Sequence, residues 1–242
     1  MKLSVLMPAY NESATVEEAV ARLLRETYPC DIELIIVDDG STDDTWARLN
    51  SIVDPRVDIH RHHVNRGKGA AVRTAASQAS GDYVVIFDAD LEYRASDIPR
   101  LLEPIERGDA QVVFGARSFG SSTAHSFWFV IGNKITTFVA NAWFNSWIHD
   151  LHTCLKVLPL DLLRELDCQQ NRFAMDTELT AKLLARGIRP YEIPVDYKAR
   201  SHEEGKKISW RDGVVSLWIL TRVRLTKRPR AARPVRARAL RG

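Results

Sequence analysis

The sequence predicts an α/β protein with a mostly parallel sheet and helices on both faces. Short apolar runs alternate with segments of helical periodicity over residues 3–117, which is the pattern of successive βαβ units. The chain has 242 residues, of which 45% are hydrophobic and 27% charged, enough for one sizeable domain of this class. The predicted strand ends are rich in acids and glycine. Ligands of such sheets bind beyond the carboxyl ends of the strands, so these ends are the first place to look for a site.

The expected elements follow one another without a linker. We expect the folded domain to occupy residues 1–225 and a basic, disordered tail to occupy residues 226–242. No internal repeat interrupts the pattern. The expected strands cover residues 3–8, 32–37, 57–62, 83–87 and 110–117, and the expected helices cover residues 13–26, 42–53, 69–79 and 95–108.

Charge is distributed unevenly along the chain. The last 21 residues contain nine Lys and Arg and no acid, whereas the rest of the chain carries 25 bases against 31 acids. Two interpretations of this tail stay open: a solvated arm, or an anchor on anionic lipid or nucleic acid. Three cysteines without a CxxC pair favour a reducing compartment over a disulfide framework.

Two apolar segments late in the chain bear on membrane association. Neither the N-terminus nor any internal run has the length of a signal peptide or a spanning helix. Residues 126–148 are apolar and aromatic but interrupted by polar residues, so they predict either an interfacial helix or an ordinary core helix. Residues 213–225 form an apolar helix that leads into the basic tail, a pattern typical of proteins bound to a membrane surface.

The stretch VVIFDADLEY, residues 84–93, brings three carboxylates to the end of a buried strand. Asp88 and Asp90 flank a single residue, and like charges this close repel each other unless a cation lies between them. Oxygen ligands of this kind, with Glu92 nearby, suit Mg²⁺ or Mn²⁺, which complete their coordination with water and substrate phosphates. The stretch therefore predicts a divalent cation site.

The other strand ends allow more ordinary interpretations. VDDGSTDD, residues 37–44, is compatible with a turn and a helix N-cap formed by Ser41 or Thr42. NRGKGAA, residues 65–71, opens a helix where backbone N–H groups and Lys68 can bind an anion, although it is neither a dinucleotide fingerprint nor a P-loop. HRHH, residues 60–63, does not have the spacing of an ordinary zinc site.

Taken together, these motifs resemble the GT-A family 2 glycosyltransferases, and within them the polyprenyl-phosphate sugar transferases of the dolichol-phosphate mannose and glucose synthase type. The resemblance extends from residue 2 to about residue 225, and it implies a GT-A type, Rossmann-like fold with a donor-binding half over about 1–117 and an acceptor half over about 118–225. The matching segments are MPAYNE, VDDGSTDD, NRGKGAA, DADLEY, FGAR, DLHTCLK, NRFAMDTELTAKLL and YEIPVDYKARSHEEGKKISWRDG.

The resemblance implies a role for each matching residue. The nucleotide-sugar donor is expected to contact Pro8, Tyr10, Glu12, Asp39, Lys68, Asp88, Arg200, Lys206 and Lys207. Asp39 would bind the base or ribose, and the three last residues belong to a loop expected to close over the diphosphate. The expected ligands of Mg²⁺ or Mn²⁺ are Asp88, Asp90 and Glu92, with Glu92 standing where the family often has glutamine.

The acceptor is expected to be a polyprenyl phosphate bound by Arg117 with Asn133 or Lys134. Asp90 and Arg117 are the residues predicted to carry catalysis. A later carboxylate serves as general base in many family members, and Asp176 is the candidate here, but a phosphate with a second pKa near ~6 is already ionised at neutral pH. We therefore expect Asp176 not to act as a base, and the alternative for it is a helix cap. Transfer would occur in one displacement with inversion.

The resemblance also sets expectations for the setting of the reaction. We expect a cytoplasmic protein, peripheral at the inner face of a membrane, with an anionic membrane surface and a separate membrane-anchoring protein as partners and no nucleic acid. Other classes stay open: a family 2 enzyme that acts on a soluble sugar, polysaccharide or natural-product hydroxyl, a non-catalytic nucleotide-binding or scaffold module, and, less favoured, a nucleotidyltransferase. GDP-mannose and UDP-glucose are equally compatible donors.

Overall fold

The computed structural model describes residues 1–117, 127–198 and 210–226. One seven-stranded sheet runs through the whole molecule, in the order β3-β2-β1-β4-β6-β5-β7. The strands are β1 Lys2–Ala9, β2 Asp31–Asp38, β3 Val57–Arg61, β4 Tyr83–Ile86, β5 Val113–Arg117, β6 Lys156–Pro159 and β7 Tyr191–Val195. The helices are α1 Val16–Arg25, α2 Thr45–Leu49, α3 Lys68–Gln78, α4 Asp97–Glu106, α5 Phe127–Phe144, α6 Leu160–Leu166, α7 Ala174–Ala185 and α8 Trp210–Leu225.

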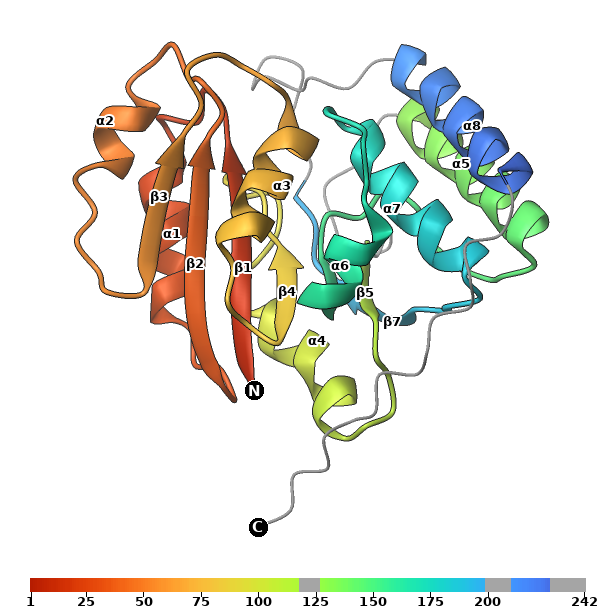
Figure 1. Cartoon of the computed structure of the whole chain (residues 1–242), viewed down its shortest axis with the longest axis horizontal. Helices are drawn as coiled ribbons and strands as arrows, with labels where there is room; N and C mark the ends of the chain where they lie inside the picture. Colours follow the sequence, from red (N-terminus) through yellow and green to blue (C-terminus); the bar gives the residue numbers. More distant parts are fainter. Residues whose placement is uncertain (118–126, 199–209, 227–242) are drawn as a thin grey trace.

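The predicted mixed α/β fold with a mostly parallel sheet is confirmed. Parallel pairing joins β1 to β2 and β4, β2 to β3, and β5 to β7, whereas β6 is antiparallel to both β4 and β5. The sequence analysis did not predict β6, which separates two strands that are neighbours in the chain. Helix α3 packs on β1 and β2 in front of the sheet in Figure 1, and α1 lies behind it.

Two apolar cores hold the fold together. The larger one joins the strands to α1, α3 and α4, and the central strand residues Val5, Leu34, Val85 and Phe114 are fully buried in it. Burial on both faces explains why these strands are continuous apolar runs. The smaller core lies between α5, α7 and α8 and includes Ala140, Leu184 and Leu220.

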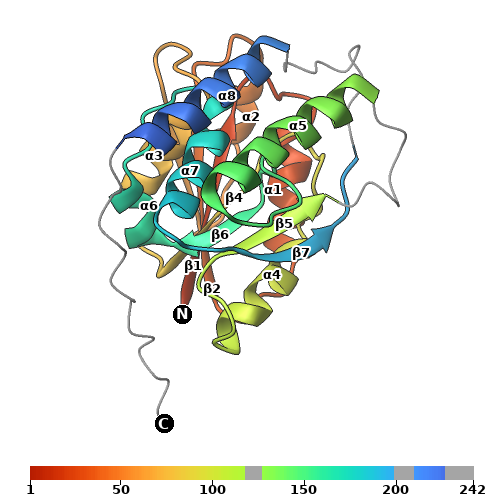
Figure 2. The same ribbon diagram turned by 90° about the vertical axis from the view of Figure 1, so that its right-hand side faces the viewer.

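Helices α5 and α8 lie side by side on the outer face of α7 (Figures 1 and 2). Each helix has a buried side and a side with large apolar residues exposed to solvent. Helix α5 therefore combines features of the two alternatives predicted for it, a core helix and an interfacial helix. Its exposed members include Ile135 and Phe138, and those of α8 include Val214 and Trp218. Among the described residues, no helix has the length and apolar character to cross a bilayer.

Candidate functional site

The loops that follow β1 and β2 are tied to each other. Asn11, in the left-handed region at φ 53°, donates its backbone N–H to Ser41 Oγ over 3.0 Å and accepts one from Thr42 N over 2.9 Å. Glu12 N donates to Thr45 Oγ1 over 2.8 Å. The predicted capping role of Ser41 or Thr42 is wrong, because α2 begins after Asp44 and these two residues bind the neighbouring loop instead.

Asp39 shapes the turn that precedes α3. It is buried, and its carboxylate accepts backbone hydrogen bonds from Arg66 over 3.0 Å and from Gly67 over 2.6 Å. It also contacts His62 Nδ1 over 2.6 Å, which gives that histidine a structural partner and accounts for one member of the HRHH run. Two charge-assisted backbone bonds of this kind hold a turn firmly. The aspartate expected to contact base or ribose thus organises the NRGKG loop.

The start of α3 meets the segment before α7 at very close range. Gly67 has φ 93°, and a Cβ added there would collide with the carbonyl oxygen of Asn171. Gly69 N donates to the same carbonyl over 2.9 Å. Only glycine combines this backbone conformation with this approach, so the two glycines join the N-terminal ends of α3 and α7.

Lys68 stands between carboxylates from the two halves of the chain. Its ammonium is 2.8 Å from Asp88 Oδ2 and 3.2 Å from Asp176 Oδ2. The other oxygen of Asp176 is 3.3 Å from the ammonium of Lys156, a fully buried side chain that also donates to the Thr153 carbonyl. Burial would raise the pKa of Asp176, but the charges of Lys156 and Lys68 outweigh it and hold that pKa below its ordinary value.

Asp176 therefore has a partner on each oxygen. The alternative that it caps its helix is wrong, because the N-cap of α7 is Phe173 and no side chain bonds there. The prediction that Asp176 is not a general base is untested, but both oxygens are bound to ammonium groups. Lys156 was not singled out from the sequence, although it is the last residue of the DLHTCLK segment that carries part of the resemblance.

Different hydrogen bonds hold the acids of the DADLE loop in place. Asp90 Oδ1 accepts the backbone N–H of Glu92 over 3.1 Å, and Leu91 between them has φ 60°, a strained conformation for a bulky residue. Glu92 accepts a 2.5 Å hydrogen bond from the hydroxyl of Tyr197, and its carbonyl accepts one from Lys198 N. The loop is thereby attached to the end of β7.

The residues present fit a divalent cation only in part. Asp88 and Asp90 are partly exposed at a strand end and offer hard oxygen ligands, which suits Mg²⁺ or Mn²⁺ completed by water and phosphate oxygens. Over residues 1–117, 127–198 and 210–226, no three His, Cys, Asp or Glu side chains converge as a ligand set. The three-carboxylate set with Glu92 therefore stays a prediction.

Arg117 forms a buried ion pair at the end of β5. Its Nε and Nη2 lie 2.6 and 2.8 Å from the two oxygens of Asp150, and Asn133 Nδ2 donates to the same carboxylate over 3.1 Å. Burial would raise the pKa of Asp150, but the Arg117 charge holds it well below its ordinary value. The Arg117 guanidinium carbon also lies 5.0 Å from the centre of the Tyr197 ring. Asn133 is buried and Lys134 is exposed, so these two acceptor candidates differ in accessibility.

His152 connects α5 to α7 and was missed by the sequence analysis. Its Nε2 is 3.0 Å from Thr136 on α5 and its Nδ1 is 3.4 Å from Thr177 on α7, which in turn contacts Ser216 on α8 over 3.0 Å. Burial lowers the pKa of His152 to about 4, so the ring is neutral at pH 7.

The remaining predicted residues divide into two groups. Pro8 is buried in β1, and Tyr10 and Glu12 are partly exposed just beyond it. Arg200, Lys206 and Lys207 lie outside the described residues, as does the tail over 227–242.

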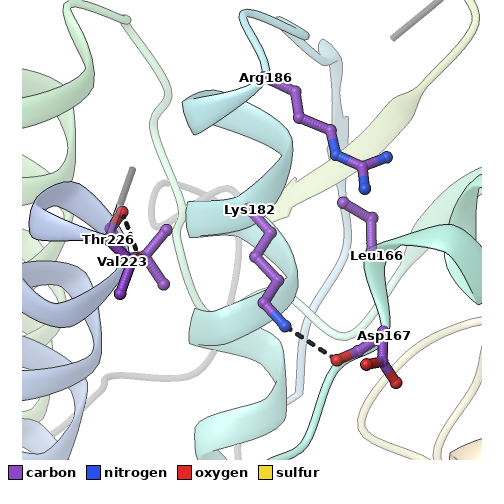
Figure 3. Close-up of a pocket in the computed structure, with 6 residues that line it drawn as sticks. All are labelled: Leu166, Asp167, Lys182, Arg186, Val223 and Thr226. Carbon is purple, nitrogen blue, oxygen red and sulfur yellow. Dashed lines mark hydrogen bonds between the residues drawn. The ribbon is translucent and has the colours of Figure 1, made fainter. Parts of the chain in front are cut away.

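A pocket of about 240 Å³ lies between the C-terminal ends of α6, α7 and α8 and contains none of the predicted residues (Figure 3). It is lined by Leu166, Asp167, Lys182, Arg186, Val223 and Thr226.

Comparison with protein families matches residues 4–167, more than half of the chain, to the family described as Glycosyl transferase family 2. The chain belongs to this family. The family 2 resemblance predicted from the motifs is confirmed, and a glycosyltransferase is what the family assignment and the fold together support.

Two curated relatives and one solved structure illustrate what this family 2 chain is similar to. It is 35% identical over 118 residues to the dolichol-phosphate mannosyltransferase of Pyrococcus furiosus, covering 48% of this chain and 33% of that protein. It is 34% identical over 116 residues to the undecaprenyl-phosphate 4-deoxy-4-formamido-L-arabinose transferase of Proteus mirabilis, covering 44% of this chain and 34% of that protein. The chain thus spans about a third of the length of these two relatives.

The similar solved structure is glucosyl-3-phosphoglycerate synthase of Mycobacterium tuberculosis, in complex with Mn²⁺, uridine diphosphate and glucosyl-3-phosphoglycerate. It has a TM-score of 0.69 and 21% sequence identity, and the similarity covers 92% of this chain and 79% of that one. At this identity the likeness concerns the fold, and it confirms the predicted GT-A type.

Proposed function

We propose that this family 2 glycosyltransferase moves a hexose, with inversion, from GDP-mannose or UDP-glucose to a polyprenyl phosphate at a membrane surface. The choice of a phosphate as acceptor rests on one observation: the two carboxylate oxygens of Asp176 are bound by Lys68 and Lys156. The names of the relatives from Pyrococcus furiosus and Proteus mirabilis support the same acceptor class.

A hydroxyl acceptor needs a base to remove its proton, whereas a phosphate acceptor does not. An effective general base has a pKa near the working pH and an oxygen within reach of the proton. Asp176 is buried, is bound to two ammonium groups and has a lowered pKa, so it is poorly suited to that role. A phosphate, with a second pKa of about 6, reaches the site already charged.

We assign donor binding to the loops at the carboxyl ends of the strands. We assign Tyr10, Glu12 and Asp39 to the nucleoside side and Asp88 with Asp90 to the diphosphate side, with Pro8, Lys68 and the cations of 199–209 as further contacts. A divalent cation at the two aspartates would supply charge neutralisation of the leaving nucleoside diphosphate. The backbone bonds between the two loops keep Tyr10 and Glu12 in a fixed relation to Asp39.

The acceptor phosphate is assigned to Arg117, with Lys134 and Asn133 nearby. Asp150 binds two nitrogen atoms of the guanidinium, so it fixes the plane in which Arg117 presents its other N–H groups. A cation at this point lowers the repulsion between the acceptor phosphate and the donor diphosphate.

The lipid part of the acceptor is assigned to the outer side of α5 and α8. Phe138 is 70% exposed and Trp218 54% exposed, and the Arg222 guanidinium carbon lies 5.3 Å from the centre of the Trp218 ring. Lys134, Arg222 and Arg224 are exposed on the same two helices. Apolar aromatic residues beside cations suit an anionic membrane surface, so we propose a peripheral, cytoplasmic-face enzyme, with a separate anchoring protein as a further partner.

One assay tests this assignment. Purified protein is incubated with Mn²⁺, a panel of labelled nucleotide-sugars and short polyprenyl phosphate, and the label entering the organic phase is counted. Transfer of mannose or glucose to the lipid, with a β-linked product, is the expected result. Transfer only to soluble hydroxyl acceptors would move the chain to that second function, and donor hydrolysis without any transfer would contradict both.

A further inference from the structure

Four side chains of alternating charge form a continuous row across the site. Asp88, Lys68, Asp176 and Lys156 follow one another at separations of 2.8, 3.2 and 3.3 Å. The row begins on the loop after β4 and ends inside the acceptor half. Asp88 is its most accessible member, with a side chain 21% exposed, whereas that of Lys156 is fully buried. Only one end of the row is therefore open to a ligand.

Lys68 is the member of the row with a choice of partners. An ammonium has three donors, and here two carboxylates lie at nearly equal distances from it. Lys156 has no such choice, because it is enclosed and also bound to the Thr153 carbonyl. A small movement of the Lys68 ammonium would exchange one carboxylate for the other without leaving its charge unpaired.

The Lys68 ammonium lies 2.8 Å from Asp88 Oδ2, so a divalent cation bound by Asp88 would stand close to a positive charge. Like charges this close repel each other, and the repulsion is stronger where burial reduces the screening by water. We propose that Lys68 is a positioning residue that neutralises Asp88 in the empty enzyme and withdraws onto Asp176 when a divalent cation binds. This inference rests on the proposed function, since it takes Asp88 and Asp90 as the cation ligands.

The arrangement makes cation binding depend on the donor. The cation alone binds weakly, because it must displace Lys68 and then remain close to it. A nucleoside diphosphate brings negative charge that offsets this repulsion, so the cation binds well only together with the nucleotide. Asp176 affects cation binding only through Lys68, because its carboxylate is the second partner onto which the ammonium moves.

Binding of Mn²⁺ alone tests the proposal directly. We measure it on the full chain from the electron paramagnetic resonance signal of the free ion, with folding checked by circular dichroism. Lys68→Met should tighten Mn²⁺ binding on the order of tenfold, because the competing charge is gone. The matched control is Lys182→Met, which removes another lysine paired with an acid but belongs to α7 outside the row, and it should leave Mn²⁺ affinity unchanged.

A double-mutant cycle tests the role of Asp176. Asp176→Asn should weaken Mn²⁺ binding, because Lys68 then has no second carboxylate to occupy. In the Lys68→Met background the same substitution should have a clearly smaller effect, and equal effects in both backgrounds would contradict the proposed exchange. If Lys68→Met does not fold, Lys68→Gln removes the charge while keeping a donor for the two carboxylates.

The outcomes separate the inference from the function on which it rests. If Asp90→Asn abolishes Mn²⁺ binding while Lys68→Met leaves it unchanged or weaker, the exchange is wrong and the proposed cation site stands. If Asp90→Asn has no effect on Mn²⁺ binding, the cation site itself is misassigned, and the inference fails with it.

Discussion

The two halves of the site use their charged residues differently. In the loops that follow β1 and β4, Glu12, Asp88 and Asp90 are partly exposed. Their positions are held by a hydrogen bond from Glu12 N to Thr45 Oγ1, by one from Glu92 N to Asp90 Oδ1 and by the Lys68–Asp88 pair. Around β5, β6 and α7, the Arg117–Asp150 and Lys156–Asp176 pairs are buried, and the outward surface of α5 and α8 carries large exposed apolar residues. The loops after β1 and β4 thus leave acids accessible to a ligand, whereas the second region pairs its charges internally, and we propose that the N–H groups of Arg117 not bound by Asp150 reach the acceptor phosphate.

The largest effect should come from the exposed acids. Asp90→Asn should reduce sugar transfer by roughly 10²-fold or more, because it removes a charged ligand proposed for the cation that would neutralise the donor diphosphate. Asp88→Asn should cost less, because we expect Asp88 to reach the cation through a water molecule or to contact the ribose. Transfer is measured with saturating donor, and thermal unfolding serves as the control for folding. Equal losses at the two positions would contradict this ranking.

Arg117→Ala should combine a loss of activity with a loss of stability. It leaves Asp150 buried without its cation, which typically destabilises a fold by about 3–5 kcal/mol. Urea unfolding measures this part. In the fraction that remains folded, transfer should fall further than in Asp176→Asn, and Arg117→Lys should not restore it because an ammonium lacks the two-pronged geometry. Full rescue by lysine would show that only the charge matters.

Asp176→Asn should separate the two acceptor classes. We expect turnover of the folded enzyme to fall less than tenfold, far below the roughly 10² to 10⁴-fold loss of a general base. Stability should drop by about 3 kcal/mol, because two buried ammonium groups lose a partner. The rate of the unmodified enzyme should decline below pH ~6 as the acceptor phosphate takes up a proton. A collapse of turnover in folded protein would instead indicate a hydroxyl acceptor.

The apolar surface of α5 and α8 should control membrane binding rather than chemistry. Replacing Phe138 and Trp218 together by serine should weaken binding to anionic vesicles by roughly thirtyfold, since each side chain loses about 1 kcal/mol of apolar burial. Val53→Ser, at another highly exposed apolar residue, is the matched control and should change nothing. Vesicle co-sedimentation measures both. Turnover of a short, water-soluble acceptor should stay the same in all variants.

The smallest effect on activity is expected from His152, whose titration affects the stability of the fold in acid. The pKa of His152 is lowered to about 4 in the folded protein, against an ordinary value of about 6.5. Between these values the unfolded chain binds a proton that the folded one does not, so stability falls as pH drops from about 6.5 to 4. We expect this residue to contribute about 3 kcal/mol of the loss by pH 4. His152→Gln should flatten the urea-midpoint profile over this range, and an unchanged slope would contradict the assignment.

The sequence predicted what depends on local pattern. Alternating strands and helices over residues 3–117 and the acids at the strand ends were all recognisable, because each follows from residue type and short-range spacing. Strand β6 was missed since it has only four residues and includes Lys156, whose charge is neutralised by Asp176 from a distant helix. The pairing of Lys68 with Asp176 was invisible for the same reason: it arises from tertiary packing between segments about a hundred residues apart.

The contact between Gly67, Gly69 and Asn171 limits how the site can open. The start of α3 and the segment before α7 are hydrogen-bonded backbone to backbone, with no side chain between them to act as a flexible spacer. A hinge that parted α3 from α7 at this point would have to break those bonds and expose the buried pair of Lys68 and Asp176. We therefore expect these two segments to move as one rigid frame, and any opening of the proposed site to come from movements elsewhere around it.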